Sequence, residues 1–313
     1  MKDRRTFIKQ SLFATGALMT GSSFKFPEMP KSDLTLSLAE WSFNRALFGG
    51  KLDHLDFPAL AKNEYGISVV EYVSGFFGGK KMDSKQAARD KSYLNELLLR
   101  SKDAGVVNHL IMVDDEGPLS SADKKLRDEA IENHKKWIEA AKFLNCVTVR
   151  VNLHGEGTTE ERKNASVDSM GRLGEFAKPM NINVVVENHG SVTSNAEWVV
   201  DIMKQVNMKN VGTLPDFGNW CISHPWGTIQ GECTEMYDIY KGLELLLPYA
   251  KGVSAKTYDF DDNGEQPKLD YKRLLGIVKK SGFKGYIGVE YEGNTQPEDE
   301  GVRKTISLIK KYY

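Results

Sequence analysis

Two acidic residues in the middle of the chain stand behind short apolar runs. Glu187 follows the run 182–186, and Asp216 follows the run 211–214 after a single proline. The stretch 196–206 between them is amphipathic with helical spacing, so this segment is predicted to fold as strand, helix and parallel strand. Both acids then lie at the carboxyl ends of strands, where α/β proteins bind their ligands. They suit proton transfer or metal binding there; the alternative is that each acid only caps the loop that follows it.

Eight apolar runs of this kind alternate with helical patterns along residues 34–313. The alternation predicts a single-domain (β/α)8 TIM barrel, because repeated strand–helix units build a parallel sheet that eight strands can close. A doubly wound sheet is the alternative, but no G-x-G-x-x-G turn follows any of the runs. The expected strands are 34–38, 67–70, 109–113, 147–153, 182–186, 211–214, 252–258 and 285–289. The expected helices are 84–102, 121–143, 159–177, 196–206, 236–249, 271–279 and 298–312.

Polar residues of one parity are expected to meet in the mouth of this barrel. Alternate strand residues point inward, and active-site groups lie at the carboxyl-end rim. At least three carboxylates would converge there, and such like charges raise one another's pKa unless a cation lies among them. That cation is either a divalent metal or the side chains of Lys256 and Arg150. The residues expected at the mouth are Glu40 or Trp41, Glu71, Arg150, Asn152, His154, Glu187, His189, Asp216, Ser254, Lys256, Glu290 and Glu292.

These positions resemble the xylose-isomerase-like TIM-barrel superfamily, which includes sugar phosphate isomerases and epimerases and endonuclease-IV-like enzymes. The resemblance spans residues 33–313 and rests on VVVENHG, PDFGNW, VSAK and IGVEYEG. It implies Glu187, Asp216 and Glu290 as metal ligands. Where relatives read H-x-K this chain has Ser254 and keeps the lysine, and where relatives often carry histidine it has Asn219. Oxygen-rich ligands favour Mn, Mg or Ca over Zn.

The resemblance implies a metal-dependent sugar isomerase or epimerase that moves a proton next to a carbonyl through an enediolate. Glu187, Glu290 and Lys256 are the expected catalytic residues, with Glu187 and Glu290 taking and returning the proton. One alternative is a 3-keto-glycoside lyase or hydratase on the same scaffold. Another is a non-catalytic sugar-binding barrel, since Ser254 could mark a degenerate site. The expected substrate-binding residues are Glu71, Arg150, Asn152, His154, His189, Asn219, Trp41 and Trp220, and Trp226 also suits stacking on a sugar.

The amino-acid composition limits the kinds of ligand and partner that the protein is expected to bind. A formal charge of -1 gives no electrostatic footprint for nucleic acid, so a small sugar or keto-sugar is the expected ligand. Three cysteines (Cys146, Cys221 and Cys233) without a CxxC spacing imply neither a disulfide framework nor a zinc–thiolate site. The sequence leaves a homo-oligomer open.

The N-terminal segment is expected to be a targeting signal and not part of the folded domain. Residues 3–9, DRRTFIK, resemble the twin-arginine export motif, and the apolar run 11–21 behind them is too short to span a bilayer. We therefore expect an export signal over residues 1–25, a linker over 26–33 and a periplasmic protein. No membrane span is expected.

Overall fold

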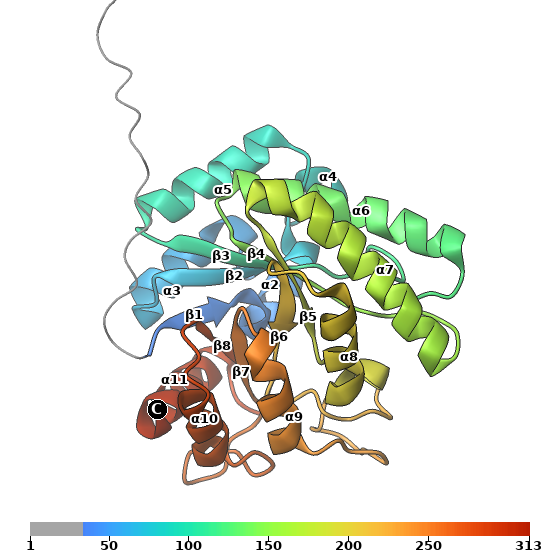
Figure 1. Cartoon of the computed structure of the whole chain (residues 1–313). Coiled ribbons are helices and arrows are strands. Elements are labelled where there is room, and N and C mark those ends of the chain that lie inside the picture. The colour runs from blue at the N-terminus through green and yellow to red at the C-terminus, as the bar shows by residue number, and fades with distance from the viewer. Residues whose placement is uncertain (1–33) are drawn as a thin grey trace, which may run out of the picture. The chain divides into compact units, whose positions relative to one another are not determined.

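Eight parallel strands form the centre of the computed structural model, which describes residues 34–313. Strands that follow one another in sequence are neighbours in the sheet, except β6 and β7, and the first strand also pairs with the last, so the sheet curls into a barrel (Figure 1). The predicted α/β barrel is confirmed. The strands are β1 Leu36–Ala39, β2 Val69–Val73, β3 Val107–Met112, β4 Thr148–Val151, β5 Asn183–Glu187, β6 Val211–Leu214, β7 Val253–Thr257 and β8 Ile287–Tyr291.

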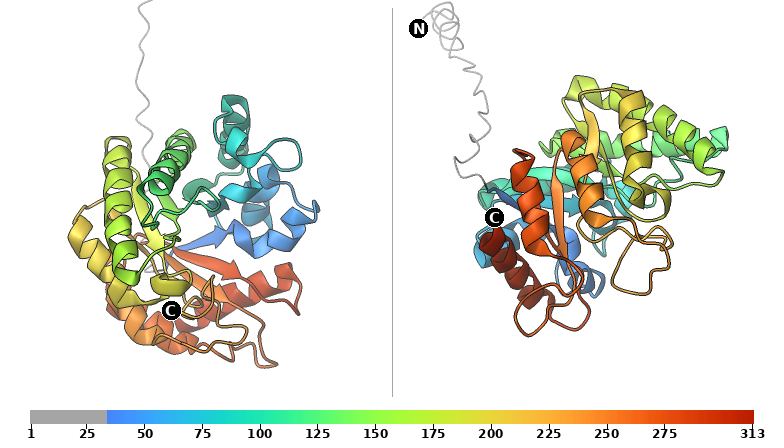
Figure 2. Two further views of the ribbon diagram at one scale, coloured as in Figure 1. Left: turned by 90° about the vertical axis from the view of Figure 1, so that its right-hand side faces the viewer. Right: turned by 60° about the horizontal axis from the view of Figure 1, so that its bottom comes forward.

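The helices lie around the outside of the strands (Figures 1 and 2). All of these α-helices except α2, α3 and α11 begin after a side-chain cap. The Asn195 side chain, for example, accepts a hydrogen bond from the backbone N–H of Trp198 in the first turn of its helix. None of the helices within 34–313 is long and apolar enough to cross a membrane. The helices are α2 Asn44–Phe48, α3 Phe57–Tyr65, α4 Ser84–Ala87, α5 Lys91–Asp103, α6 Lys124–Phe143, α7 Thr159–Ala177, α8 Ala196–Val206, α9 Ile239–Leu246, α10 Tyr271–Lys280 and α11 Glu298–Tyr312.

The seam between β6 and β7 closes just beyond the end of β6. Asp216 and Ser254 form an isolated parallel bridge there. The Ser254 backbone N–H donates to the Pro215 carbonyl at 2.9 Å, and the Phe217 N–H donates to the Ser254 carbonyl at 3.1 Å. Closure at this point fixes Asp216 beside β7, whose inward residues belong to the proposed site.

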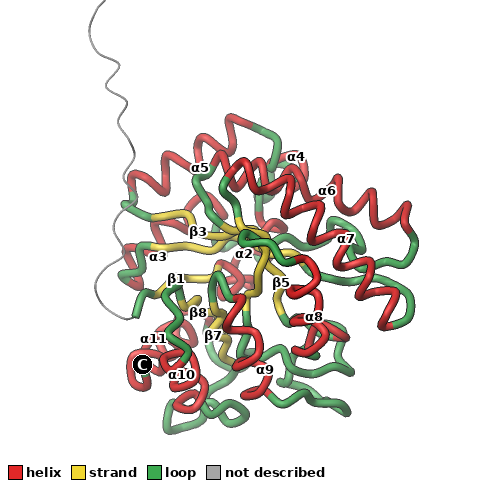
Figure 3. Tube along the Cα trace, in the orientation of Figure 1, coloured by secondary structure: helices red, strands yellow, loops and turns green. Residues whose placement is uncertain are grey.

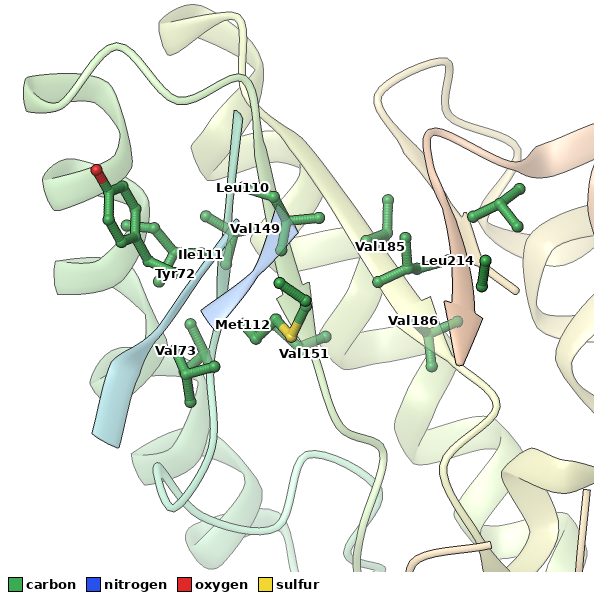
Figure 4. Packing of buried hydrophobic residues seen from close by; sticks show 14 of the residues in the cluster. Tyr72, Val73, Leu110, Ile111, Met112, Val149, Val151, Val185, Val186 and Leu214 are labelled. Carbon is green, nitrogen blue, oxygen red and sulfur yellow. The ribbon is translucent and has the colours of Figure 1, made fainter. Parts of the chain in front are cut away.

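Alternation along β4 and β5 separates the core from the mouth. Val149, Val151 and Val186 are fully buried, and they pack with other strand residues as Figure 4 shows. Burial of each such side chain stabilises the fold by roughly 1.5–3 kcal/mol. The polar residues between them, Arg150 and Glu187, take the opposite parity. The apolar set therefore anchors the strands while the polar set is held inside the barrel.

Two helix predictions were wrong in detail. The segment 84–102 is not one helix, because the side chain of Asp90 caps a new helix, α5, by accepting from the N–H groups of Ser92 and Tyr93. The segment 236–249 begins as α9 only at Ile239, after Asp238, and its last turn is a 3-10 helix over Leu247–Tyr249.

A disulfide joins Cys221 and Cys233, which the sequence had not implied. The two residues are 12 positions apart in the segment between β6 and α9, which is mostly loop (Figure 3). Cys146 is buried and unpaired. The predicted export signal and linker, residues 1–25 and 26–33, lie outside the described residues.

Candidate active site

Six polar side chains meet at the carboxyl-end mouth of the barrel. Five of them were predicted from parity or from strand ends, and Asn219 from the resemblance; each is at most 4% exposed. Such burial of charged groups requires that they pair with one another. We call this set the mouth cluster: Arg150, Glu187, Asp216, Asn219, Lys256 and Glu290.

The ammonium of Lys256 lies at the centre of three carboxylates. Its Nζ is 3.6 Å from Asp216 Oδ2 and 3.4 Å from Glu290 Oε1. A third carboxylate, Glu292 Oε2, lies 3.2 Å away on the more exposed side. The register of β7 and β8 places Lys256 directly opposite Glu290, so these contacts follow from strand pairing.

Glu187 is held from two sides. Its Oε2 lies 3.0 Å from Arg150 Nε, and its Oε1 accepts from Asn219 Nδ2 at 3.1 Å. The side-chain oxygen Oδ1 of Asn219 accepts in turn from Lys256 Nζ at 3.3 Å. Asn219, which stands where the resemblance implied histidine, therefore links the Glu187 side of the mouth to the Lys256–Glu290 side.

Burial and crowded charge shift the acid–base properties of the cluster. Burial raises the pKa of Glu187 well above its usual range, and the Arg150 guanidinium offsets this only in part. Burial also raises the pKa of Asp216 to about 7; the Lys256 ammonium lowers it in part, and the nearby Glu290 carboxylate raises it further. Burial disfavours the charge on Lys256, but the carboxylates of Asp216 and Glu290 outweigh it and raise the lysine pKa well above its usual range. Carboxyl groups that titrate near neutrality are suited to proton transfer.

Two further polar residues extend the mouth, one after the end of β3 and one after the end of β4. Asp114 Oδ1 accepts from Arg150 Nη1 at 2.7 Å and from Asn152 Nδ2 at 2.6 Å. The carbonyl oxygen of Asn152 is buried without a hydrogen-bond partner in the described structure. Asp114 was not among the predicted site residues, although it follows the third apolar run directly, the same signal that identified Glu187.

An aromatic and imidazole wall lies on one side of the mouth. Trp226 is 53% exposed, and its ring meets those of His154 and His189 edge-on at 5.2 and 5.7 Å. His154 Nε2 and His189 Nδ1 are buried without hydrogen-bond partners within residues 34–313. Burial, together with the nearby Arg150 charge, lowers the pKa of both imidazoles, so both are neutral at pH 7. Two neutral imidazoles beside an exposed indole suit a ligand that is rich in hydroxyl groups.

Trp41 lies on the other side. Its indole Nε1 donates to Glu292, the carboxylate that also pairs with Lys256. Its ring stacks on Phe76 at a centroid distance of 5.9 Å, and Phe48 beside them is 67% exposed. Trp41 is thus joined to the mouth cluster through one carboxylate.

Three predicted positions do not join the mouth cluster. Glu71 is buried beneath it, where it accepts a hydrogen bond from the Ser37 hydroxyl, and burial raises its pKa to about 7. Glu40, the alternative to Trp41, instead pairs with His54 at 2.7 Å. Trp220 is completely buried against Tyr237, with glycine on α9 allowing the close approach, so its ring is not available to a ligand.

The predicted divalent metal does not fit the donors as they are arranged. Among residues 34–313 no three His, Cys, Asp or Glu side chains form a group that could hold a metal ion. Ser254, in place of the implied histidine, donates its hydroxyl to Glu290 Oε2 at 2.7 Å. The space between Asp216 and Glu290 holds the ammonium of Lys256. These side chains therefore bind one another and the Lys256 ammonium in place of a metal.

A closed parallel barrel with paired acids and buried cations at its carboxyl-end mouth defines the class, a TIM barrel with an enzyme-like site. The family described as xylose isomerase-like TIM barrel matches residues 60–312, and the chain belongs to this family.

Individual relatives are more distant. The C-glycoside deglycosidase alpha subunit of Arthrobacter globiformis is 37% identical over 68 residues, which are 22% of this chain and 19% of that protein. The chain thus matches less than a fifth of that relative's length. The crystal structure of 3-keto-D-glucoside 4-epimerase, YcjR, from E. coli has a TM-score of 0.63 at 13% identity, over 90% of this chain and 100% of that one. The IOLI protein with a binding zinc atom has a TM-score of 0.64 at 17% identity, over 90% and 99%. These structural likenesses show a shared fold.

Proposed function

We propose that this protein is a sugar isomerase or epimerase that transfers a proton at the carbon next to a carbonyl group. The observation that carries the proposal is the continuous link Glu187–Asn219–Lys256–Glu290 across one buried mouth. It places two carboxylates on opposite sides of one ammonium. That is the arrangement needed to remove a proton from one position of a sugar, hold the resulting negative charge, and return the proton at another.

In the proposed reaction a carboxylate of Glu187 or Glu290 takes the proton from the carbon beside the carbonyl. The electron pair of the broken C–H bond forms a C=C bond, and the carbonyl π electrons move to oxygen to give an enediolate. Lys256 lies where its ammonium can stabilise this oxyanion. Return of the proton to the opposite face of the same carbon gives an epimer. Return to the former carbonyl carbon gives an isomer, in which the oxygen on that carbon has gained a proton and the neighbouring hydroxyl oxygen has lost one to become the new carbonyl. Atoms and charge balance without an oxidant.

A keto-sugar is the proposed substrate class. The C–H bond that reacts must stand beside a carbonyl, because only then can its electrons be delocalised onto oxygen. The structural neighbour from E. coli is named for a 3-keto-glucoside, which supports this choice. The neutral His154 and His189, with Trp226 beside them, are the proposed contacts for its hydroxyl groups and apolar face.

The second candidate is a 3-keto-glycoside lyase, and the segmental similarity to deglycosidase alpha subunits favours it. The first step is the same proton removal beside the ketone. The new electron pair then forms a C=C bond to the neighbouring carbon and expels the group attached there, which leaves with its bonding electrons and accepts a proton. The shared first step means that the same carboxylates serve both reactions.

Product mass separates the two candidates. Keto-glucosides and free keto-sugars are incubated with the enzyme, and the products are analysed by mass spectrometry and NMR. An isomer of unchanged mass supports the isomerase, whereas loss of the aglycone or of water supports the lyase. Glu187→Gln and Glu290→Gln should each abolish either reaction. Sugar binding by the wild-type protein without any product would contradict both.

We also propose that the protein is exported to an oxidising compartment. The twin-arginine-like motif near the N-terminus supports this proposal, and so does the Cys221–Cys233 disulfide, since disulfides persist mainly outside the reducing cytosol. Fractionation of cells that express the full chain tests it: recovery from the periplasm, lost in an Arg4→Lys/Arg5→Lys variant, is the expected result. Equal cytoplasmic recovery of both would contradict it.

A further inference from the structure

We propose that Lys256 is the resident cation of this site and takes the place of a metal ion, so that the enzyme works without one. This inference rests on the proposed function but is tested separately from it. The geometry points to it: one ammonium lies within 3.6 Å of an oxygen from each of three carboxylates. Carboxylates so close together require a cation among them, and the chain supplies that cation itself.

The carboxylate oxygens that would bind a metal are already in use. Asp216 Oδ1 accepts from the backbone N–H of Gly218 at 2.7 Å, and Asp216 Oδ2 faces the ammonium. Glu290 Oε2 accepts from the Ser254 hydroxyl at 2.7 Å, while Glu290 Oε1 faces the ammonium. A metal at this point would have to displace Lys256 and break the Ser254 contact.

Ser254 and Lys256 act together in this arrangement. Both are inward-facing residues of β7, and both contact the same carboxylate, Glu290. A hydroxyl at position 254 fixes one oxygen of Glu290 by a hydrogen bond of 2.7 Å, which leaves the other oxygen to the ammonium. An imidazole there would instead offer a nitrogen donor to a metal. Ser254 and Lys256 together therefore favour the lysine ammonium over a metal ion at this site.

The test measures metal binding directly and needs no turnover. The purified full-length protein is dialysed against Mn²⁺ or Zn²⁺, its metal content is measured, and its melting temperature is recorded with and without each ion. Wild type should hold substoichiometric metal and show no metal-dependent shift. The double variant Ser254→His/Lys256→Met gains a nitrogen ligand and loses the ammonium. It should bind one equivalent and melt several degrees higher with metal than without.

Each outcome decides the proposal. A stoichiometric metal in wild type that is lost in Glu290→Gln would overturn it, and so would a folded double variant that binds no metal. If the double variant does not fold, Ser254→His alone keeps the test decisive. This variant retains Lys256 and should remain metal-free, whereas stoichiometric metal in it would show that Lys256 does not exclude the ion. Absence of sugar turnover would refute the proposed function and leave these readings unchanged.

Discussion

His109 is the clearest acid-sensitive point in the barrel. It lies on β3, is 4% exposed, and neither ring nitrogen has a hydrogen-bond partner in the described part of the chain. Its ring packs edge-on against Tyr286 at 4.5 Å. Burial lowers the pKa of His109 from 6.5 to about 4, because the imidazolium would lose its hydration without gaining a partner. The folded protein therefore holds this residue neutral.

The consequence for stability has a definite sign and size. As the pH falls below 6.5 the unfolded chain binds a proton at His109, but the folded chain does not until about pH 4, so the free energy of unfolding decreases across this window. A difference of roughly 2.5 pKa units corresponds to about 3 kcal/mol when complete, of which about 2 kcal/mol is reached by about pH 5. At higher pH the contribution of His109 to the free energy of unfolding no longer changes with pH.

The variant His109→Leu removes the term without removing a hydrogen bond. Urea unfolding of wild type and variant at about pH 7.5 and about pH 5 should show the variant gaining about 2 kcal/mol relative to wild type at the lower pH. His134, whose pKa burial also lowers to about 4, is the matched comparison, and His134→Gln should show a similar relative gain. An equal difference between His109→Leu and wild type at both pH values would refute the reasoning.

Three further predictions concern the mouth and its surroundings. Arg150→Met and Lys136→Met each break a buried ion pair, so each should lower the free energy of unfolding, measured with urea, by about 3–5 kcal/mol. Only Arg150→Met should also abolish turnover per folded molecule. Equal losses of turnover in the two variants would contradict the place of Arg150 in the site. Trp226→Ala, at an exposed position, should change stability by less than about 0.5 kcal/mol yet raise KM, so an unchanged KM would remove it from the substrate wall. Reduction, or the double change Cys221→Ser/Cys233→Ser, should destabilise the loop by up to about 3 kcal/mol, seen as faster proteolysis there, and unchanged cleavage would contradict this.

The fold could be predicted because one simple rule repeats along the chain. Each apolar run ends in polar residues, and parallel strands bring all their carboxyl ends to one rim. Parity then predicted that Arg150 and Glu187 would face the same interior, and they form an ion pair. The same rule, applied to the third apolar run, would also have predicted Asp114. The sequence contained this signal, but the rule was not applied there.

Other features depend on contacts that a linear pattern does not contain. Trp220 follows Asp216 closely and looks like a rim residue, but Gly242 on α9 leaves space for its ring in the core. The partner of Cys221 is a cysteine 12 residues away on an irregular loop, and only the path of that loop brings them together. The sequence left open whether a divalent metal or the side chains of Lys256 and Arg150 neutralise the carboxylates. The structure was needed to decide, because the distance from Lys256 to each carboxylate depends on strand register.

The central claim, proton transfer beside a carbonyl in the mouth cluster, is tested most directly by solvent exchange. A keto-sugar substrate is incubated with the enzyme in deuterium oxide, and deuterium at the carbon next to the carbonyl is followed by NMR. The account predicts incorporation that depends on the enzyme and disappears in Glu187→Gln and Glu290→Gln. Product formation without any deuterium entering that position, or incorporation that survives in both variants, would contradict it.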